Sequence, residues 1–476
     1  MTTPIKTPGR PTSRPPSGPV TLALYGGMLV LAALAFLFIR QQGEGLVQQA
    51  GAVAMPLAKQ AHAHVLMHVL TAMVVVIAAA RLLGTVFRAV GQPAVIGEVI
   101  AGIMLGPSLL GRFSPAAQNF VMPPEVAPYL GIVAQIGVLL FMFLVGLELD
   151  TSLLRKRSHA TLAISHTSIV VPFLLGATLA LWLYPSLSPA GVSFTNFSLF
   201  LGLSLSITAF PVLARILSDR GIQRSQLGVV SLACAAIDDA SAWCLLAVVV
   251  GIVRSAAANS LVTIALTVAY IAFMAFVVRP VAVKLVRRAE LVERTGSGTT
   301  ALVFVALLVS ALVTEAIGIH ALFGAFLLGA VIPHDSALSK DIRHRLEEFV
   351  IVVLLPAFFA LTGMRTEMGL LSTSTDWLFA GLILLVACAG KFGGAMLSAR
   401  FTGFGWRDAS MLGALMNTRG LMELIVLNIG LDLGVISPRL FAMLVIMAVV
   451  TTLMTSPLLT LLSERREITG RLDTVL

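Results

Sequence analysis

The chain has 476 residues, of which 58% are hydrophobic and only 12% are charged, whereas a soluble globular protein carries about 25% charged residues. This composition excludes a soluble protein and predicts an all-α polytopic protein that crosses a membrane many times. The formal net charge is +9, so nucleic acid must be weighed as a partner against the positions of the basic residues.

The first segment, residues 1–18, is rich in Pro, Thr and Arg and has no acidic residue, which predicts a disordered tail. An organellar transit peptide has a similar composition, but this stretch is short and broken by prolines. The apolar segment 19–39 is too long for the core of a signal peptide, so we predict an extra N-terminal span there.

The segment 64–462 is predicted to form one membrane domain, followed by a short cytoplasmic tail at 463–476 that leaves no room for a nucleotide-binding regulatory domain. Apolar stretches of about 20 residues, the length that crosses a bilayer, define the predicted spans. About fourteen occur, near 19–39, 64–83, 90–110, 128–147, 160–184, 196–217, 225–252, 259–279, 300–316, 318–333, 348–364, 377–399, 408–430 and 438–461.

The basic residues are distributed unequally between the two sides of this alternating topology. Loops on the side of the N-terminus hold 24 of the 32 Lys and Arg residues, and loops on the opposite side hold 6. This bias predicts that both termini are cytoplasmic. The positive charge therefore indicates membrane topology, not nucleic-acid binding. We expect a multi-pass protein of the bacterial inner membrane.

Cysteine and histidine do not predict a metal or disulfide framework. Three cysteines lie inside predicted spans without CxxC spacing: Cys234, Cys244 and Cys388. Three histidines lie close together at the start of the second span, with no carboxylate or cysteine near in sequence: His62, His64 and His68. We interpret these as an interfacial cluster, with a metal pair at His64 and His68 as the less favoured alternative.

Two weak internal similarities predict a repeat. Span 4 contains VLLFMFLVGLE (138–148) and span 11 contains VLLPAFFALTGM (353–364), while span 3 contains IGEVIAGIMLGP (96–107) and span 10 contains IGIHALFGAFLLGAVIP (317–333). Each pair is seven spans apart, and an odd offset places the two copies in opposite orientations. Inverted-topology repeats, here spans 2–7 and 9–14, are typical of secondary transporters.

The same offset pairs span 6 with span 13, where substrate-binding interruptions are expected. Span 6 contains SLSITAFPVLARIL, in which Thr208 precedes Pro211. A proline removes a backbone donor and clashes with the preceding turn. Span 13 contains Asn417, Arg419 and Gly420 at mid-depth. The sequence therefore predicts two broken helices, although Pro211 taken alone is also compatible with a structural kink.

Five charged residues fall inside predicted spans: Asp238, Asp239, Lys391, Arg419 and Glu423. A charge at the bilayer centre costs about 2.5–3.5 kcal/mol, so all five would cost on the order of 12–18 kcal/mol. That exceeds or matches the stability of a typical domain, about 5–15 kcal/mol. These groups must therefore be paired, hydrated or neutralised. The acids Glu98 and Glu148 lie near span ends, where we expect solvated or capped carboxylates.

Arg419 and Glu423 are spaced i, i+4 and can form a purely structural ion pair on a helix. Asp238 and Asp239 are adjacent, and neighbours on a helix point about 100° apart. One acid can therefore face Lys391 while the other faces a cavity at the broken helices. Burial raises the pKa of a carboxyl group and lowers that of an amine, which favours competition between a proton and a monovalent cation at one carboxylate.

Taken together, the motifs resemble those of the monovalent cation:proton antiporter-2 family. The similar motifs run in order from about residue 65 to 461: IGEVIAGIMLGPSLLG, FLVGLELD, SITAFPVLARILSDRGI, AAIDDASAW, GIHALFGAFLLGAVIP, GKFGG and MNTRGLMELIVLNIG. The sequences of the motifs SITAFPVLARIL and NTRGLMELIVLNIG are most similar to those of the branch with plant cation/proton exchangers and their bacterial relatives.

This resemblance implies a core domain with two crossed unwound helices, which moves against a dimerisation domain of a homodimer in an elevator-like cycle. It implies that Asp239 is the main cation- and proton-binding carboxylate and that Asp238 is a neighbour able to pair with Lys391. It also implies that Thr208 lies at the first helix break and Arg419 at the second.

The chain departs from bacterial sodium/proton antiporters of the superfamily at two positions. Ala209 replaces a second polar residue after the threonine, and Leu421 stands where an acid is usual, with Glu423 further on. The transported cation, sodium or potassium, is therefore left open. We expect secondary active exchange of that cation for protons, without cofactor or enzymatic activity. A channel or uniporter without proton coupling is the alternative, and adjacent aspartates on one helix argue against an intramembrane aspartyl protease.

Overall fold

The computed structural model describes residues 18–43, 65–148, 159–222, 225–254, 260–291 and 297–472. Most of the predicted N-terminal tail and the histidines His62 and His64 lie outside these ranges. Within them every regular element is a helix, so the all-α prediction is confirmed for the described residues.

The first group of helices precedes the first predicted break. It comprises α1 (Gly18–Gly43), α2 (Val65–Ala89), α3 (Ala94–Leu105), α4 (Leu110–Phe113), α5 (Pro115–Val121), α6 (Ala127–Glu148) and α7 (His159–Leu187). The middle of the chain forms α8 (Phe194–Ser206), α9 (Phe210–Asp219), α10 (Gln226–Arg254), α11 (Ser260–Phe273), the π-helix η1 (Met274–Val278), α12 (Arg279–Leu291), α13 (Ser297–Ile317) and α14 (Ala321–Val331).

The last third of the chain follows α14. It forms α15 (Ala337–Phe349), the π-helix η2 (Val350–Leu354), α16 (Leu355–Met364), the 3₁₀ turn η3 (Met368–Leu370), α17 (Ser374–Phe401), α18 (Trp406–Met416), α19 (Leu421–Asp432) and α20 (Pro438–Leu472). The helix α20 continues into the predicted 463–476 tail.

Eleven helices in the described part of the chain are long and apolar enough to cross a membrane, which confirms a multi-pass membrane protein but not the count of fourteen. The other three predicted spans correspond to short or interrupted helices: α8 with α9, α14 alone, and α18 with α19. Each is shorter than the roughly 20 continuous residues that a span requires. The difference in count therefore lies at the predicted breaks and at α14.

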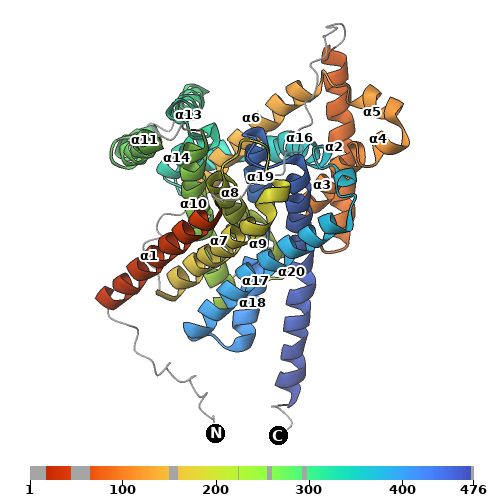
Figure 1. The fold of residues 1–476 in the computed structure, drawn as a ribbon. Coiled ribbons are helices and arrows are strands. Elements are labelled where there is room, and N and C mark those ends of the chain that lie inside the picture. Colours follow the sequence, from red (N-terminus) through yellow and green to blue (C-terminus); the bar gives the residue numbers. More distant parts are fainter. Residues whose placement is uncertain are drawn as a thin grey trace.

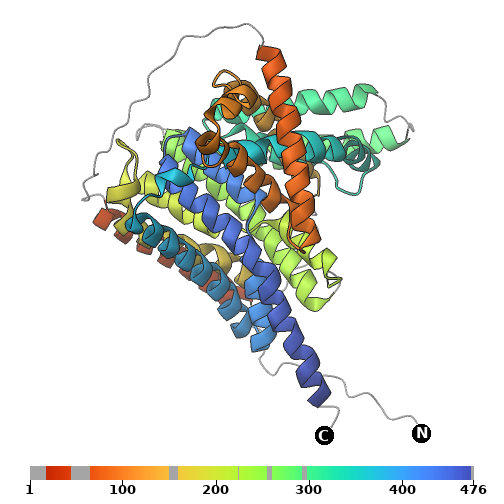
Figure 2. The same cartoon turned by 90° about the vertical axis from the view of Figure 1, so that its right-hand side faces the viewer.

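The helices pack in two groups. In one, α7 lies along α17 and α8, and α17 also packs against α18 and α20. In the other, α6 packs on α14, and both α2 and α16 pack on α3. Figure 1 shows α17 and α18 low in the view and α2, α3 and α6 in its upper part, and Figure 2 shows the same arrangement from the side.

Glycines permit two close contacts in the second group. A Cβ atom at Gly102 of α3 would overlap the backbone of Ala360 in α16, and one at Gly363 would overlap the backbone of Val99. A Cβ atom at Gly146 of α6 would likewise overlap the backbone of α14, and one at Gly329 of α14 would overlap the backbone of α6. Small residues at such contacts let membrane helices approach until their backbones touch.

Candidate functional site

Two pairs of short helices meet end to end at the centre of the molecule. The helix α8 ends at Ser206 and α9 begins at Phe210, while α18 ends at Met416 and α19 begins at Leu421. The two extended segments touch, because the backbone N–H of Ala209 donates to the carbonyl of Thr418 at 3.0 Å. We call this contact of residues 207–209 with 417–420 the crossing.

The chain leaves the helix before the proline. Pro211 is the second residue of α9, where a missing N–H costs no helical hydrogen bond. The residues between the helices are Ile207, Thr208 and Ala209. At the other break, Asn417 caps α18 and Gly420 directly precedes α19. All five residues predicted at the breaks therefore lie at or beside the crossing: Thr208, Pro211, Asn417, Arg419 and Gly420.

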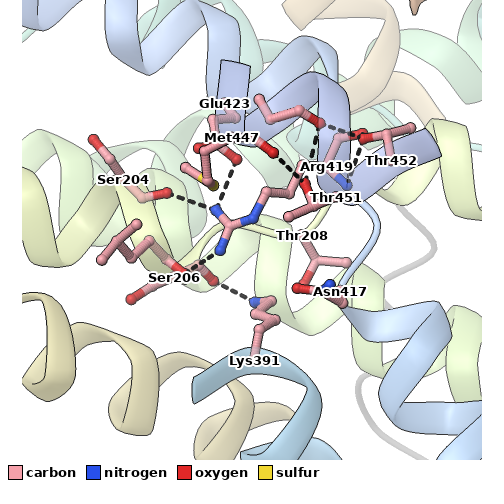
Figure 3. A network of polar contacts seen from close by, with 12 residues as sticks. Ser204, Ser206, Thr208, Lys391, Asn417, Arg419, Glu423, Met447, Thr451 and Thr452 are labelled. Carbon is pink, nitrogen blue, oxygen red and sulfur yellow. Dashed lines mark hydrogen bonds and ion pairs between the residues drawn. The ribbon is translucent and has the colours of Figure 1, made fainter. Parts of the chain in front are cut away.

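The end of α8 leaves carbonyl oxygens without a helical donor. Two buried, positively charged side chains bind these oxygens. The Arg419 guanidinium donates to the carbonyls of Ser204 at 2.8 Å and Leu205 at 2.6 Å. The Lys391 ammonium donates to the carbonyl of Ser206. A helix C-terminus carries partial negative charge, which favours positive groups there. Figure 3 shows both side chains pointing at this end of α8.

Arg419 also forms a buried ion pair with Glu423. The two side chains are fully buried and lie 2.8 Å apart, Nη1 to Oε2. Glu423 is in the first turn of α19, where a negative charge is stabilised by the helix dipole. The Thr452 hydroxyl of α20 donates to the carbonyl of Arg419 at 2.7 Å. These contacts fit a role in holding the break in place.

Asp238, on α10, is fully buried and surrounded by donors. Its carboxylate accepts hydrogen bonds from the hydroxyls of Ser165 at 2.5 Å, Ser168 at 2.6 Å and Thr208 at 2.8 Å. The Lys391 ammonium lies 3.2 Å from the same carboxylate. The structure therefore places Asp238 against Lys391, the pairing that the family resemblance implies and that the residue pattern alone leaves open.

Asp239 has a different environment, although it is the next residue of α10. Its side chain is only 5% exposed, and neither carboxylate oxygen has a hydrogen-bond partner within the described ranges. The backbone N–H of Phe210, the first residue of α9, is close enough to the carboxyl group for a weak donor interaction, but too loosely placed to form a full hydrogen bond. Asp239 is thus a buried acid beside the first break whose oxygens remain available.

The sequence did not reveal the two serines that bind Asp238. Ser165 and Ser168 lie on α7, three residues apart in SHTSIVV, so they share one helix face. An SxxS pair in an apolar helix was the only signal, and serines at that spacing are common in membrane helices, where their hydroxyls also bond to the backbone. Only the packing of α7 against α10 gives these two hydroxyls their partner.

Other candidates lie apart from the acids or have ordinary contacts. The Asn417 amide donates weakly to the Cys388 sulfur at 3.6 Å. His68 stacks edge-on against Phe120 in α5, far along the chain from either break. The side chains of the three cysteines differ in exposure: Cys234 is buried, Cys388 is partly buried and Cys244 is exposed.

Comparison with known proteins decides the family. The family profile described as "Sodium/hydrogen exchanger, transmembrane" matches residues 69–462. The chain belongs to the sodium/hydrogen exchanger family. Relatives named Na(+)/H(+) antiporter NhaS4 from Synechocystis sp. and Cation/H(+) antiporter 20 from Arabidopsis thaliana are 44% and 38% identical to this exchanger over 395 residues each. K(+)/H(+) antiporter 1 from Saccharomyces cerevisiae is 35% identical over 387 residues.

The extent of the match differs between these relatives. The exchanger is matched over 83% of its length to 96% of the Synechocystis protein. The alignments with the plant and yeast proteins cover 80% and 78% of this chain but only 47% and 44% of theirs, so the chain spans about half their length. These relatives are antiporters, which confirms the expectation of a transporter, not an enzyme.

The fold agrees with that of a solved antiporter. The structure of the sodium proton antiporter MjNhaP1 from Methanocaldococcus jannaschii superposes with a TM-score of 0.61, covering 83% of this chain and 96% of that one. The sequences are only 13% identical, so this likeness concerns the fold alone.

Proposed function

We propose that the exchanger moves sodium or potassium in exchange for protons, and that Asp239 is the group at which the two ions compete. The observation that carries the proposal is the contrast at the crossing: Asp238 is occupied by four donors, while Asp239 is buried without a hydrogen-bond partner in the described residues. An ionised carboxylate in such a place needs a cation or a proton.

Exchange follows from this single site. A carboxylate that holds a proton has lost the charge that attracts a monovalent cation, so Asp239 carries one ion or the other in each passage. The backbone carbonyl of Met416 and the hydroxyl of Thr208 lie at the crossing, 3.3 Å apart, and such oxygens are the ligands that alkali ions take from broken helices. Lys391 compensates Asp238, so the charge of the site changes only at Asp239.

The helix contacts support the inverted repeats, spans 2–7 and 9–14. If span 3 corresponds to span 10 and span 4 to span 11, the contact of α3 with α16 must have a counterpart between α14 and α6. Both contacts occur, each through a glycine of either helix: Gly102 with Gly363 and Gly329 with Gly146. The same correspondence pairs span 6 with span 13, so it exchanges the two broken helices and leaves the crossing between them unchanged. We therefore propose fourteen spans in all, including the extra N-terminal span.

The two packing groups support elevator-like alternating access. We propose that α7–α10 and α17–α20 form a core that moves against a dimerisation domain built from α2–α6 and α11–α16. Two contacts between the groups are weak: the ion pair of Arg365 with Asp432 at 2.8 Å is partly exposed, and the Gln92 amide donates to the carbonyl of Leu453 at 3.4 Å. The buried hydrogen bond from the Asn428 amide of α19 to the Thr362 hydroxyl of α16, at 2.8 Å, would have to break in the movement. Exposed pairs contribute only about 0–1 kcal/mol each, so they permit movement.

Topology and assembly complete the proposal. The positive-inside bias supports an inner-membrane protein with both termini cytoplasmic, and a homodimer would be joined through the second group. The names of the relatives support sodium or potassium as the cation, since one is called a Na(+)/H(+) antiporter and another a K(+)/H(+) antiporter.

The test is transport by purified protein in liposomes that contain a pH-sensitive dye. After a proton gradient is imposed, adding Na⁺ or K⁺ is expected to dissipate it, and the cation that does so at the lower concentration is the substrate. No dissipation with Na⁺, K⁺ or Li⁺ would refute the proposal. Cation currents without proton movement would instead identify a channel or uniporter.

A further inference from the structure

A cavity of about 460 Å³ lies between α12 and the turn that joins α14 to α15. Volumes of about 300–1,000 Å³ are typical of sites that bind small molecules. The helix α12 forms one wall, and the end of α14 with the start of α15 forms the other. We call this cavity the basic pocket, and the described residues that line it are Arg279, Val283, Val286, Arg287 and residues 330–336.

The wall formed by α12 combines positive charge with apolar surface. Its four lining residues are spaced i, i+4, i+7 and i+8, which places them on one face of the helix. Arg279 and Arg287 stand at the two ends of this face, and both are exposed. Val283 and Val286 lie between them. A ligand on this wall would therefore meet two guanidinium groups and the apolar surface of two valines.

The opposite wall adds little negative charge. The helix α15 begins there with Ser336 as its N-cap, whose hydroxyl accepts a hydrogen bond from the backbone N–H of Ser339 at 3.2 Å. The start of a helix carries partial positive charge and favours anions. Asp335 is the one acid among the described lining residues, and its carboxylate lies 3.0 Å from Nε2 of His334. The two arginines therefore leave the pocket with an excess of positive charge.

The basic pocket lies at one end of a helical segment that can cross the membrane. The segment Ala265–Arg287 is long and apolar enough to do so, and Arg287 is its last residue. The bias of Lys and Arg predicts that this end faces the cytoplasm. Arg279 lies about two turns before the end, and arginine side chains near the end of a span extend towards the headgroups of the bilayer. The pocket is therefore at the level of the lipid phosphates.

We propose that the basic pocket binds an anionic phospholipid, such as phosphatidylglycerol, from the cytoplasmic leaflet. The lipid phosphate is attracted by the two arginines, since guanidinium groups bind phosphate oxygens through charge-assisted hydrogen bonds. The first carbons of the acyl chains lie against apolar lining residues such as Val283 and Ile332. A soluble phosphate would meet the same charges but would leave this apolar surface uncovered, which favours the lipid. The bound lipid joins α12 to the turn between α14 and α15.

The test titrates phosphatidylglycerol into the delipidated full chain in detergent and counts bound lipid by native mass spectrometry. Arg279→Gln and Arg287→Gln are each expected to weaken binding about fivefold, the contribution of one basic residue near an anionic headgroup. Lys284→Gln is the matched control, because it removes a positive charge from an exposed position of α12 that is not among the described lining residues. It is expected to bind like wild type. An equal loss in all three variants would mean diffuse attraction and overturns the inference, as does no loss in the arginine variants.

Two further ligands identify what the pocket recognises. Phosphatidylcholine has the same acyl chains without net charge, and glycerol 3-phosphate has the phosphate without the chains. Each is expected to bind to wild type at least about tenfold more weakly than phosphatidylglycerol. Equal binding of phosphatidylcholine overturns the recognition of charge, and equal binding of glycerol 3-phosphate identifies a site for a soluble phosphate instead of a lipid.

A variant of the opposite wall keeps the result interpretable if the arginine variants do not fold. Ser336→Asp retains a good N-cap for α15 while adding a negative charge to the lining of the pocket. It is expected to weaken binding of phosphatidylglycerol about fivefold, and unchanged binding overturns the inference. Because binding is measured without transport, the result does not depend on the proposed function.

Discussion

The two sides of α10 at the crossing differ sharply, although the acids on them are neighbours in sequence. On the side of α7 and α17, Asp238 is bonded to three hydroxyls and a lysine. On the side of α9, Asp239 is also buried but has no hydrogen-bond partner in the described ranges. A fully bonded acid is committed to the structure, and an unbonded one is available for ions. The difference supports the proposal that the two identical side chains have separate tasks, Asp238 in the structure and Asp239 in ion binding.

The largest expected effect comes from the unbonded acid. Asp239→Asn is expected to reduce cation-dependent proton flux to the level of protein-free liposomes, because an amide can bind neither a proton nor a cation by charge. Its melting temperature is expected to remain near that of wild type, since no hydrogen bond is lost. Both are measured on the same purified protein by dye fluorescence and thermal unfolding. Near-normal flux would remove Asp239 from the site.

Removing the partner of the bonded acid is expected to act on stability first. Lys391→Met leaves Asp238 as an uncompensated buried charge, which typically destabilises by about 3–5 kcal/mol. The double variant Asp238→Asn with Lys391→Met removes both charges and is expected to recover much of that loss. Thermal unfolding of the two variants gives the comparison. Equal melting temperatures for the single and the double variant would show that the pair does not depend on its charge.

Lys391→Ala is expected to alter transport only in part, because the lysine acts on the site through its charge. We expect the pH profile of exchange to shift, or exchange to become electroneutral, without being abolished. The measurement is flux against pH with the membrane potential clamped by an ionophore that does not carry the tested cation. A profile identical to wild type at every pH would contradict the role assigned to Lys391.

A smaller effect is expected at the first break. Thr208→Val removes one hydroxyl from Asp238 while preserving shape, and a hydrogen bond to a charged group contributes about 1.5–3 kcal/mol. Ser168→Ala is the matched control on α7, since it removes a hydroxyl from the same carboxylate oxygen. Both variants are expected to lose similar stability, but only Thr208→Val is expected to weaken cation binding. Equal transport by the two variants would mean that Thr208 only supports Asp238.

The smallest effect is expected from an exposed ion pair. Arg365→Gln breaks the contact with Asp432, where both side chains are partly solvated, and such pairs contribute about 0–1 kcal/mol. The melting temperature is therefore expected to change little, while the rate of exchange changes by a factor of a few. A large loss of stability would indicate that this pair fastens the two helix groups together and would contradict their free movement.

The sequence was sufficient to predict most of the fold and the identity of the charged residues. Apolar stretches gave the spans, and the cost of burying charge singled out Asp238, Asp239, Lys391, Arg419 and Glu423. What the sequence could not predict depends on contacts between helices distant in the chain. Lys391 is 153 residues from Asp238, and no local pattern says which of two adjacent acids it meets.

The serines of α7 show the same limit. The hydroxyl of Ser165 is 73 residues away from its acceptor in Asp238, and a serine in a membrane helix usually has local backbone partners as well. The length of the broken helices was also hard to predict, because apolar composition continues through both breaks. Only the loss of helical geometry at residues 207–209 and 417–420 separates them.

Two positively charged side chains bind the end of α8, and this affects how the protein tolerates mutation. Arg419 and Lys391 are bonded there to main-chain oxygens of residues 204–206, which every amino acid provides. Side chains at these positions are therefore free to vary over evolutionary time without removing an acceptor. Insertions or substitutions that let α8 run on without interruption into α9 would withdraw all three acceptors at once.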